Sequence, residues 1–287
     1  MKILVIGSNG MVGNVVALWM KEHGHTVEGY DEQKNEKIPT IIGTLHNEKL
    51  LCDVIRNGDY NAVIYCAAII NQEAESDRAN AVYVNSYLPH LIEKITSDMN
   101  TVLVYRGTDC VFSGKRGAYT VNDVPDAESF YAKTKMIGAI INKKDITIRT
   151  SLIGPETVSS GTGLFNWFMM QTGEVGGYKN AIWTGVTTIE FAREIDYLLS
   201  HNCHGLFQCV PQKAISKYEL LCLFKDYFDI DKKIIGIENE HIDKSLIPNI
   251  SVSGLQIPEY DKMMQDMKEW ITKHIDIYKH YIRSVKR

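Results

Sequence analysis

The stretch KILVIGSNGMVG, residues 2–13, decides the fold of this chain of 287 residues. Residues 2–6 are a short run of mostly apolar, β-branched side chains, which is typical of a strand buried on both faces of a parallel sheet. Glycines follow at 7, 10 and 13, and the apolar spacing from Met11 to His23 predicts a helix that stops at Gly24. A strand, a glycine turn and a helix in this order predict a site for the diphosphate of a dinucleotide.

Each glycine of this loop has its own task. The first permits a tight turn, the second lets the backbone approach the diphosphate, and the third lets the helix pack closely on the strand. Unpaired amides and the positive dipole end of the helix then favour an anion. The cofactor contacts predicted in the loop are Gly7, Asn9, Gly10, Met11, Val12 and Gly13.

Asp31 ends a second predicted strand over about 25–30, some 18 residues after Gly13. A carboxylate at this position accepts a hydrogen bond from a ribose 2′-hydroxyl and repels a 2′-phosphate. No arginine is close in sequence, although Lys34 and Lys37 offer positive charge. We therefore expect a nicotinamide dinucleotide, NAD(H) or NADP(H), with a preference for NAD(H).

Strands and helices alternate through the first half of the chain. Further strands are expected at 62–66, 101–106 and 146–150, and loops at 32–46 and 107–128. Helices are expected at 47–57, 75–97 and 129–142, where Pro89 should kink or bound the long one. This alternation predicts an α/β fold, a Rossmann-type doubly wound parallel sheet over residues 1–150.

The alternation loosens after residue 151. We expect a smaller substrate-binding α/β region over 151–287, from which about 185–215 returns to the Rossmann body. Helices are expected near 161–172, 187–200 and 216–228, a short strand near 205–210 and irregular chain over 231–258. Residues 259–284 carry Met263, Met267 and Trp270 at amphipathic-helix spacing, and core packing explains this stripe better than a partner site.

Composition excludes several function classes. Hydrophobic residues make up 45% of the chain, charged residues 23%, and the net charge is −4, so a nucleic-acid partner is not expected. None of the six cysteines has metal-site spacing, which predicts reduced thiols and no metal. A signal peptide and a long apolar run are both missing, so we expect a cytoplasmic protein without a membrane span.

Tyr131 and Lys135 stand one turn apart on the helix expected at 129–142, so they share a face. A nearby ammonium favours a phenolate, and Lys135 is therefore expected to lower the pKa of Tyr131 and tune it as a general acid or base. Lys135 could also hold the nicotinamide ribose. Thr108 follows the fourth strand, at the sheet edge where active sites gather, and its hydroxyl could bind the same carbonyl oxygen.

These motifs together resemble those of the extended short-chain dehydrogenases/reductases. TDCVFSG at 108–114, GAY at 117–119 and Asp123 are similar to the dTDP-4-dehydrorhamnose reductase pattern STDYVFDG, then GPYxExD, then YGxSK. Further matches lie at 66–68, 85, 149–151, 185–188 and 215–220. The similarity covers about residues 1–225 and is most specific in the first 150.

The resemblance implies an NAD(P)H-dependent reductase that delivers hydride to C4 of a nucleoside-diphosphate-linked 4-keto-6-deoxy sugar. Tyr131 would protonate the oxygen and Thr108 would orient it. The resemblance further implies cofactor contacts at Cys66, Ala67, Ala68, Asn85, Tyr131 and Lys135, and substrate contacts at Val111, Phe112, Tyr119 and Ser151. Many such reductases pair through helices, which leaves a homodimer open.

The chain departs from the family pattern at several positions. Gly107 replaces a serine, Val121 replaces a glutamate, and the late RPxNS segment is IPNIS at 247–251, without its arginine. The nucleotide, the sugar or both can therefore differ. Two alternatives stay open: a related epimerase or dehydratase, and a non-catalytic regulatory subunit that keeps the cofactor site. The Asp-Glu pair of dehydratases is replaced by Asp109 and Cys110.

Overall fold

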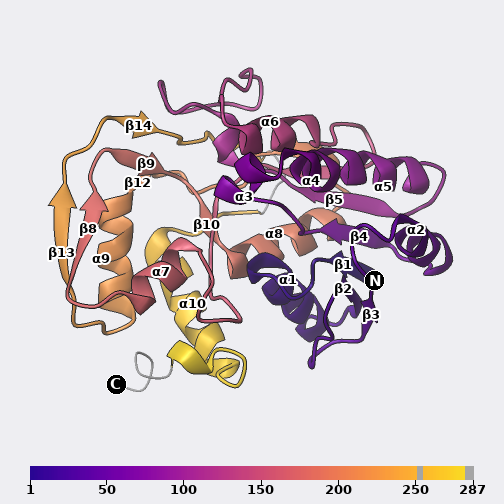
Figure 1. The fold of residues 1–287 in the computed structure, drawn as a ribbon, viewed down its shortest axis with the longest axis horizontal. Helices are drawn as coiled ribbons and strands as arrows, with labels where there is room; N and C mark the ends of the chain where they lie inside the picture. The colour runs from indigo at the N-terminus through magenta and orange to yellow at the C-terminus, as the bar shows by residue number, and fades with distance from the viewer. Residues whose placement is uncertain (251–254, 282–287) are drawn as a thin grey trace.

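The computed structural model describes residues 1–250 and 255–281. Its centre is a seven-stranded sheet in which neighbouring strands are parallel (Figure 1). The chain moves from β3 at one edge to β4 on the far side of β1, which confirms the expected doubly wound Rossmann-type sheet. In spatial order the strands are β11 (Gly205–Phe207), β6 (Ile146–Ile148), β5 (Val102–Arg106), β4 (Ala62–Tyr65), β1 (Lys2–Ile6), β2 (Thr26–Asp31) and β3 (Thr40–Ile42).

Apolar side chains cover both faces of this sheet, because successive residues of a strand point to opposite sides. In β1, Ile3 and Val5 join a core cluster with α1 (Met11–Glu22) and α8 (Thr188–Ser200). Leu4 and Ile6 join the opposite cluster with α2 (Glu48–Asn57) and α5 (Leu88–Thr96). Helices therefore pack on both faces (Figure 1), and a ligand has access to the sheet at the strand ends.

The segments expected as one loop and one long helix are each more divided in the structure. Residues 32–46 contain β3, which adds an edge strand beside β2. The expected helix over 75–97 separates into α3 (Asn71–Ser76), α4 (Arg78–Val82), a π-helical turn (Tyr83–Tyr87) and α5. Asp77 caps α4 by accepting from the Asn80 amide at 3.1 Å. Pro89 lies in the first turn of α5, where its missing N–H leaves no helical hydrogen bond unmade.

Helix α6 (Phe130–Ile137) is shorter than the expected 129–142 and has Ser129 as its N-cap. Gly138 ends it at the C-cap. A Cβ added to Gly138 would lie 1.8 Å from the carbonyl oxygen of Asn85, in the π-helical turn. A larger residue at 138 would therefore push α6 away from that turn.

Smaller sheets follow β6. β8 (Glu174–Tyr178) pairs with β13 (Lys233–Ile237), and β7 (Leu152–Ile153) pairs with β10 (Val186–Thr187). β9 (Ala181–Trp183) lies between β12 (Ile215–Ser216) and β14 (Ile242–Asp243). β13 and β14 fall within 231–258, for which the sequence predicts irregular chain. Helices α7 (Leu164–Met170) and α9 (Lys217–Tyr227) lie near their expected positions.

The C-terminal helix α10 (Tyr260–Lys273) packs on α8 and α9. Its Met263, Met267 and Trp270 are buried in the larger core cluster, which confirms core packing for the described part of the stripe, while residues 282–284 lie outside it. α8 and β11, from the segment 185–215, belong to the layers of the large sheet; the division at residue 150 stays a proposal.

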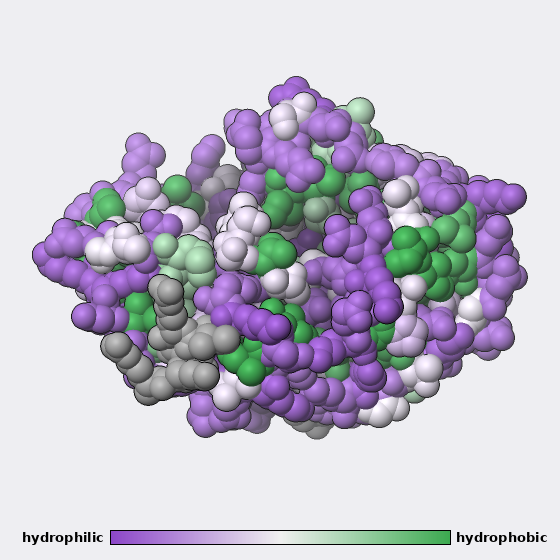
Figure 2. Space-filling model, turned by 60° about the horizontal axis from the view of Figure 1, so that its bottom comes forward, coloured by the Kyte–Doolittle hydropathy of each residue, from purple (hydrophilic) through white to green (hydrophobic). Residues whose placement is uncertain are grey.

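Surface and cysteine chemistry agree with an ordinary globular chain. All six cysteines are free. Within residues 1–250 and 255–281, no helix combines the length and apolar character that a membrane crossing needs. The face shown in Figure 2 is mostly hydrophilic, with apolar side chains in separate patches.

Candidate active site

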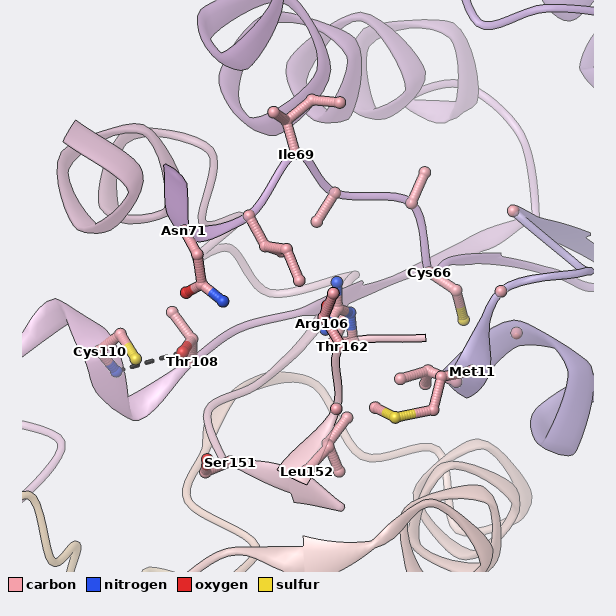
Figure 3. A pocket seen from close by; sticks show the side chains of 18 of the residues that line it. Met11, Cys66, Ile69, Asn71, Arg106, Thr108, Cys110, Ser151, Leu152 and Thr162 are labelled. Carbon is pink, nitrogen blue, oxygen red and sulfur yellow. Dashed lines mark hydrogen bonds between the residues drawn. The ribbon is translucent and has the colours of Figure 1, made fainter. Parts of the chain in front are cut away.

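A cavity of about 760 Å³ opens along the carboxyl ends of β1, β4 and β5 (Figure 3). Asp31, at the end of β2, lines it on the other side of β1. The cavity joins the glycine loop to the predicted catalytic pair, at the edge where open parallel sheets bind ligands. Its predicted lining residues are Gly7, Gly10, Met11, Val12, Gly13, Asp31, Cys66, Ala67, Ala68, Thr108, Tyr131 and Ser151.

The glycine loop has the geometry of an anion cradle. Gly7 has φ +78°, a left-handed conformation that glycine adopts without strain. A Cβ on Gly13 would lie 2.0 Å from the Gly7 carbonyl oxygen, so only glycine lets α1 start this close to β1. Gly10 is the N-cap of α1, and no side chain caps the helix. The first amides of α1 are therefore available at the cavity, and they fit a diphosphate.

Asp31 both lines the cavity and supports the loop. Its Oδ2 accepts a hydrogen bond from the Asn9 amide at 2.9 Å. Asn9 itself is not a lining residue of the cavity, and its side chain donates to the Gln33 carbonyl at 2.6 Å. Lys34 pairs with Glu36 and Lys37 with Asp276, so both lysines that could offset Asp31 are engaged elsewhere.

Tyr131, on α6, lines the cavity together with Thr108. Burial raises the pKa of Tyr131 to about 12, while the Arg106 guanidinium and the Thr108 hydroxyl act in the opposite direction. Thr108 Oγ1 accepts from the Cys110 amide at 3.1 Å (Figure 3) and donates to Asp109 Oδ1 at 3.4 Å. At neutral pH Tyr131 is therefore a phenol that can donate a proton beside a fixed hydroxyl.

Lys135 does not act on Tyr131 as the sequence predicts. Its Nζ is buried without a hydrogen-bond partner, 4.0 Å from the centroid of the Tyr105 ring. Lys135 lines a separate cavity of about 230 Å³ rather than the main one. Burial, and then the Arg106 guanidinium, hold its pKa well below the usual value. The expected lowering of the Tyr131 pKa by Lys135 is wrong, because that pKa is raised and the cation opposing the rise is Arg106.

Arg106 is a cavity residue that sequence reasoning missed. It is the last residue of β5, and in Figure 3 it lies near the middle of the cavity, between Thr108 and Cys66. Its Nε is buried without a hydrogen-bond partner, and in the described chain its guanidinium forms no ion pair. The available signal was a charged residue closing the apolar run 102–105, where an unpaired charge is costly unless a ligand meets it.

Asn85 supports the cavity wall instead of facing the cavity. It is buried in the π-helical turn and is not a lining residue. Its Oδ1 accepts from the Ile69 amide at 2.9 Å, and its Nδ2 donates to the Ile69 carbonyl at 2.8 Å and to Thr134 Oγ1 at 3.0 Å. The expected cofactor contact is therefore corrected to a positioning role, holding residues 67–70 in place.

Three expected substrate contacts also lie outside the main cavity. The chain after Thr108 makes a 3-10 turn, Asp109–Val111, which turns the following residues inward. Phe112 and Tyr119 stack with ring centroids 4.1 Å apart, and both belong to a small core cluster with Leu246. Val111 belongs to that cluster as well and lines the smaller cavity. Of the expected substrate contacts, Ser151 alone lines the main cavity.

Distant segments complete the cavity. Residues 154–163 close over the glycine loop, where Thr157 Oγ1 donates to the Asn9 carbonyl at 3.4 Å. Glu156 lines the cavity and accepts from the Gly163 amide at 2.7 Å. Lys217, the first residue of α9, also lines it, with Nζ 4.4 Å from the centroid of the Trp183 ring. These contacts join parts far apart in sequence, so no local motif reveals them.

The late IPNIS segment has a structural role in the part that is described. Asn249 Oδ1 accepts from the Gln208 amide at 2.6 Å, and its Nδ2 donates to the Leu206 carbonyl at 3.0 Å. The segment thus holds the chain at β11, and Ser251 lies outside the described residues.

Residues 1–174 match the family described as the RmlD substrate binding domain. The chain belongs to this family. A curated relative, the probable low-salt glycan biosynthesis reductase Agl14 of Haloferax volcanii, is 28% identical over 270 residues, which cover 87% of this chain and 85% of the relative. The chain is thus similar to a named reductase along most of both lengths.

Two further likenesses bear on this RmlD-family chain. The methionine adenosyltransferase 2 subunit beta of Mus musculus is 22% identical over 278 residues, covering 88% of this chain and 83% of that protein. The crystal structure of dTDP-4-dehydrorhamnose reductase from Bacillus anthracis in complex with NADP has a TM-score of 0.79, with 19% identity, covering 93% of this chain and 98% of that chain. At this identity the structural likeness establishes a shared fold.

Proposed function

We propose that this RmlD-family protein is a nicotinamide-dependent reductase of a nucleoside-diphosphate-linked 4-keto-6-deoxy sugar. The observation that carries the proposal is the single cavity that runs from the glycine loop to Thr108 and Tyr131. A cofactor held at one end of this cavity and a carbonyl held at the other end are within one continuous space. The similarity to a named glycan biosynthesis reductase supports the same chemistry.

A bound reduced nicotinamide supplies the hydride that forms the new C–H bond at the carbonyl carbon. The carbonyl π electrons move to oxygen, and Tyr131 gives its phenolic proton to that oxygen. Thr108 orients the oxygen through its hydroxyl, while the first amides of α1 hold the diphosphate. Because burial raises the pKa of Tyr131 to about 12, the group begins the reaction as an acid, which suits reduction.

For the cofactor we propose NAD(H), since Asp31 lines the cavity beyond β1 and a carboxylate there repels a 2′-phosphate. We further propose a cytoplasmic enzyme, with a homodimer as a candidate assembly. Val82, Tyr87, Met136 and Ile137 support a dimer face, because these apolar side chains are exposed on neighbouring elements.

A second candidate is a non-catalytic subunit that keeps the dinucleotide site. The similarity to a methionine adenosyltransferase subunit beta favours it, and it covers most of both chains. An epimerase has less support, because a Tyr131 phenol with a raised pKa is a poor base for removing a proton.

The deciding experiment offers dTDP-, UDP-, GDP- and CDP-linked 4-keto-6-deoxy sugars with NADH or NADPH and follows the coenzyme absorbance. Turnover of one of these sugars is the expected result. Dinucleotide binding without turnover of any sugar would support the subunit, and the absence of dinucleotide binding would overturn both candidates.

A further inference from the structure

The sheet topology determines the course of a dinucleotide in the cavity. Its diphosphate fits the first amides of α1, after β1, and β1 has β2 on one side and β4 on the other. One half must therefore extend toward Asp31 at the end of β2. The other half must cross the end of β4, at Cys66 and Ala67, to reach Thr108 beyond β5. The inference below rests on the proposed function in taking this second half to be the nicotinamide.

Arg106 stands on that second course. It closes β5, it lines the cavity, and it lies between Thr108 and Cys66 in Figure 3. A nicotinamide ring that delivers hydride to a carbonyl beside Tyr131 and Thr108 has to come to rest next to this side chain.

The charge of Arg106 is not neutralised within the protein. Its Nε is buried without a hydrogen-bond partner, and it forms no ion pair among residues 1–250 and 255–281. The carboxylates of Asp31 and Glu156, which also line the cavity, are hydrogen-bonded to the amides of Asn9 and Gly163. A guanidinium stays protonated throughout the physiological pH range, so the charge is permanent.

We propose that Arg106 makes the protein select the reduced over the oxidised dinucleotide. The two forms differ by one positive charge, which the oxidised nicotinamide ring carries and the reduced ring lacks. An unneutralised guanidinium beside the ring repels the charged form and leaves the neutral form unaffected. Arg106 is therefore a specificity-determining residue for the redox state of the cofactor.

Neighbouring groups respond to the same field. After burial, the Arg106 guanidinium is the next cause that lowers the pKa of Lys135, because it disfavours a second cation nearby. It also opposes the rise in the pKa of the Cys66 thiol, because it favours an anion. A cationic ring placed between these groups meets the repulsion that Lys135 meets.

The consequence for a reductase is directional. The reduced dinucleotide binds preferentially before the reaction. Hydride transfer leaves a positive charge on the dinucleotide beside Arg106, and this charge weakens its binding and promotes its release. Product dinucleotide then competes poorly with fresh reduced dinucleotide.

The test measures dissociation constants of NADH and NAD⁺, and of NADPH and NADP⁺, by calorimetry with the protein alone. Arg106→Met should reduce the preference for the reduced form by on the order of 10- to 100-fold, mainly through tighter binding of the oxidised form. Arg106→Lys should keep most of the preference. The matched control is Arg116→Met, which removes an arginine paired with Asp123 and not lining the cavity, and it should leave the ratio unchanged.

An unchanged ratio in Arg106→Met, with both forms still bound, would overturn the inference while leaving the proposed function intact. Such a result would be expected if Arg106 met an anion on the sugar instead. Failure of the unaltered protein to bind any nicotinamide dinucleotide would overturn the proposed function itself. Arg106→Gln, which is neutral but polar, repeats the measurement if methionine at this buried position prevents folding.

Discussion

Tyr131 and Thr108 carry the proposed chemistry at the scale of single residues. Tyr131→Phe keeps the buried ring and removes the proton donor, so turnover should fall by about 10²- to 10⁴-fold, while dinucleotide affinity changes little. Steady-state rates and coenzyme titrations measure the two effects. The control is Tyr119→Phe, whose ring is stacked in the Phe112 cluster away from the main cavity. Normal turnover in Tyr131→Phe would refute the proposed role.

Asp31 tests the cofactor preference. Asp31→Asn removes the carboxylate charge but keeps an oxygen that can accept from the Asn9 amide. We expect the affinity for NADPH to rise relative to NADH by on the order of tenfold, because the repulsion of a 2′-phosphate is lost. Binding titrations with both coenzymes measure the ratio. A ratio equal to that of the unaltered protein would show that Asp31 does not discriminate.

Lys217 introduces a pH dependence into stability. Burial lowers its pKa to about 8, below the roughly 10.4 of a lysine in an unfolded chain. The unfolded state therefore binds more protons between these values, and the free energy of unfolding rises with pH there. Lys217→Met removes this term, so its stability relative to the unaltered protein should be most favourable below about pH 8 and decline toward pH 10.

Urea unfolding of both proteins across this pH range measures the difference. The pH dependence is the test, because loss of the contact with Trp183 shifts the difference equally at every pH only if Lys217 does not titrate. Lys213→Met, at an exposed position in the preceding turn, should show no such trend. A constant difference for Lys217→Met would contradict the prediction.

At the scale of elements, the glycine loop depends on the close approach of α1 to β1. A Cβ at Gly13 would overlap the Gly7 carbonyl, whereas one at Gly10 would lie 3.6 Å from it. Gly13→Ala should lower the free energy of unfolding by about 1–3 kcal/mol. Gly10→Ala, at an extended residue with φ −68°, should cost less than about 1 kcal/mol. Denaturant unfolding compares the two variants, and equal losses would contradict this account.

Element types in the Rossmann half follow from local pattern, and their ends do not. β1, β4 and β5 are apolar runs whose burial on both faces is written in composition. Helix α6, in contrast, ends where Gly138 meets Asn85, and the helix expected over 75–97 divides at Asp77 and the π-helical turn. Such ends depend on partners that are distant in sequence.

The C-terminal helix joins the two ends of the chain at the scale of the whole molecule. Met267 of α10 is 0% exposed in the core cluster that also contains α1 and α8. Met267→Ala should therefore lower the free energy of unfolding by about 2–5 kcal/mol. Gln265→Ala, on the exposed side of the same helix, should change it by less than about 0.5 kcal/mol. Calorimetric melting separates the two, and a mild effect at Met267 would favour a partner surface.

The sequence by itself determined the doubly wound sheet, the glycine loop and the pair Thr108 and Tyr131, because periodicity, glycine spacing and strand ends are local properties. Only the tertiary structure decided which cation serves the site. Arg106 faces the cavity while Lys135 is buried over Tyr105. Residues 154–163 and Lys217 reach the cavity from distant segments. Long-range packing selects such contacts, and a single sequence holds no local record of it.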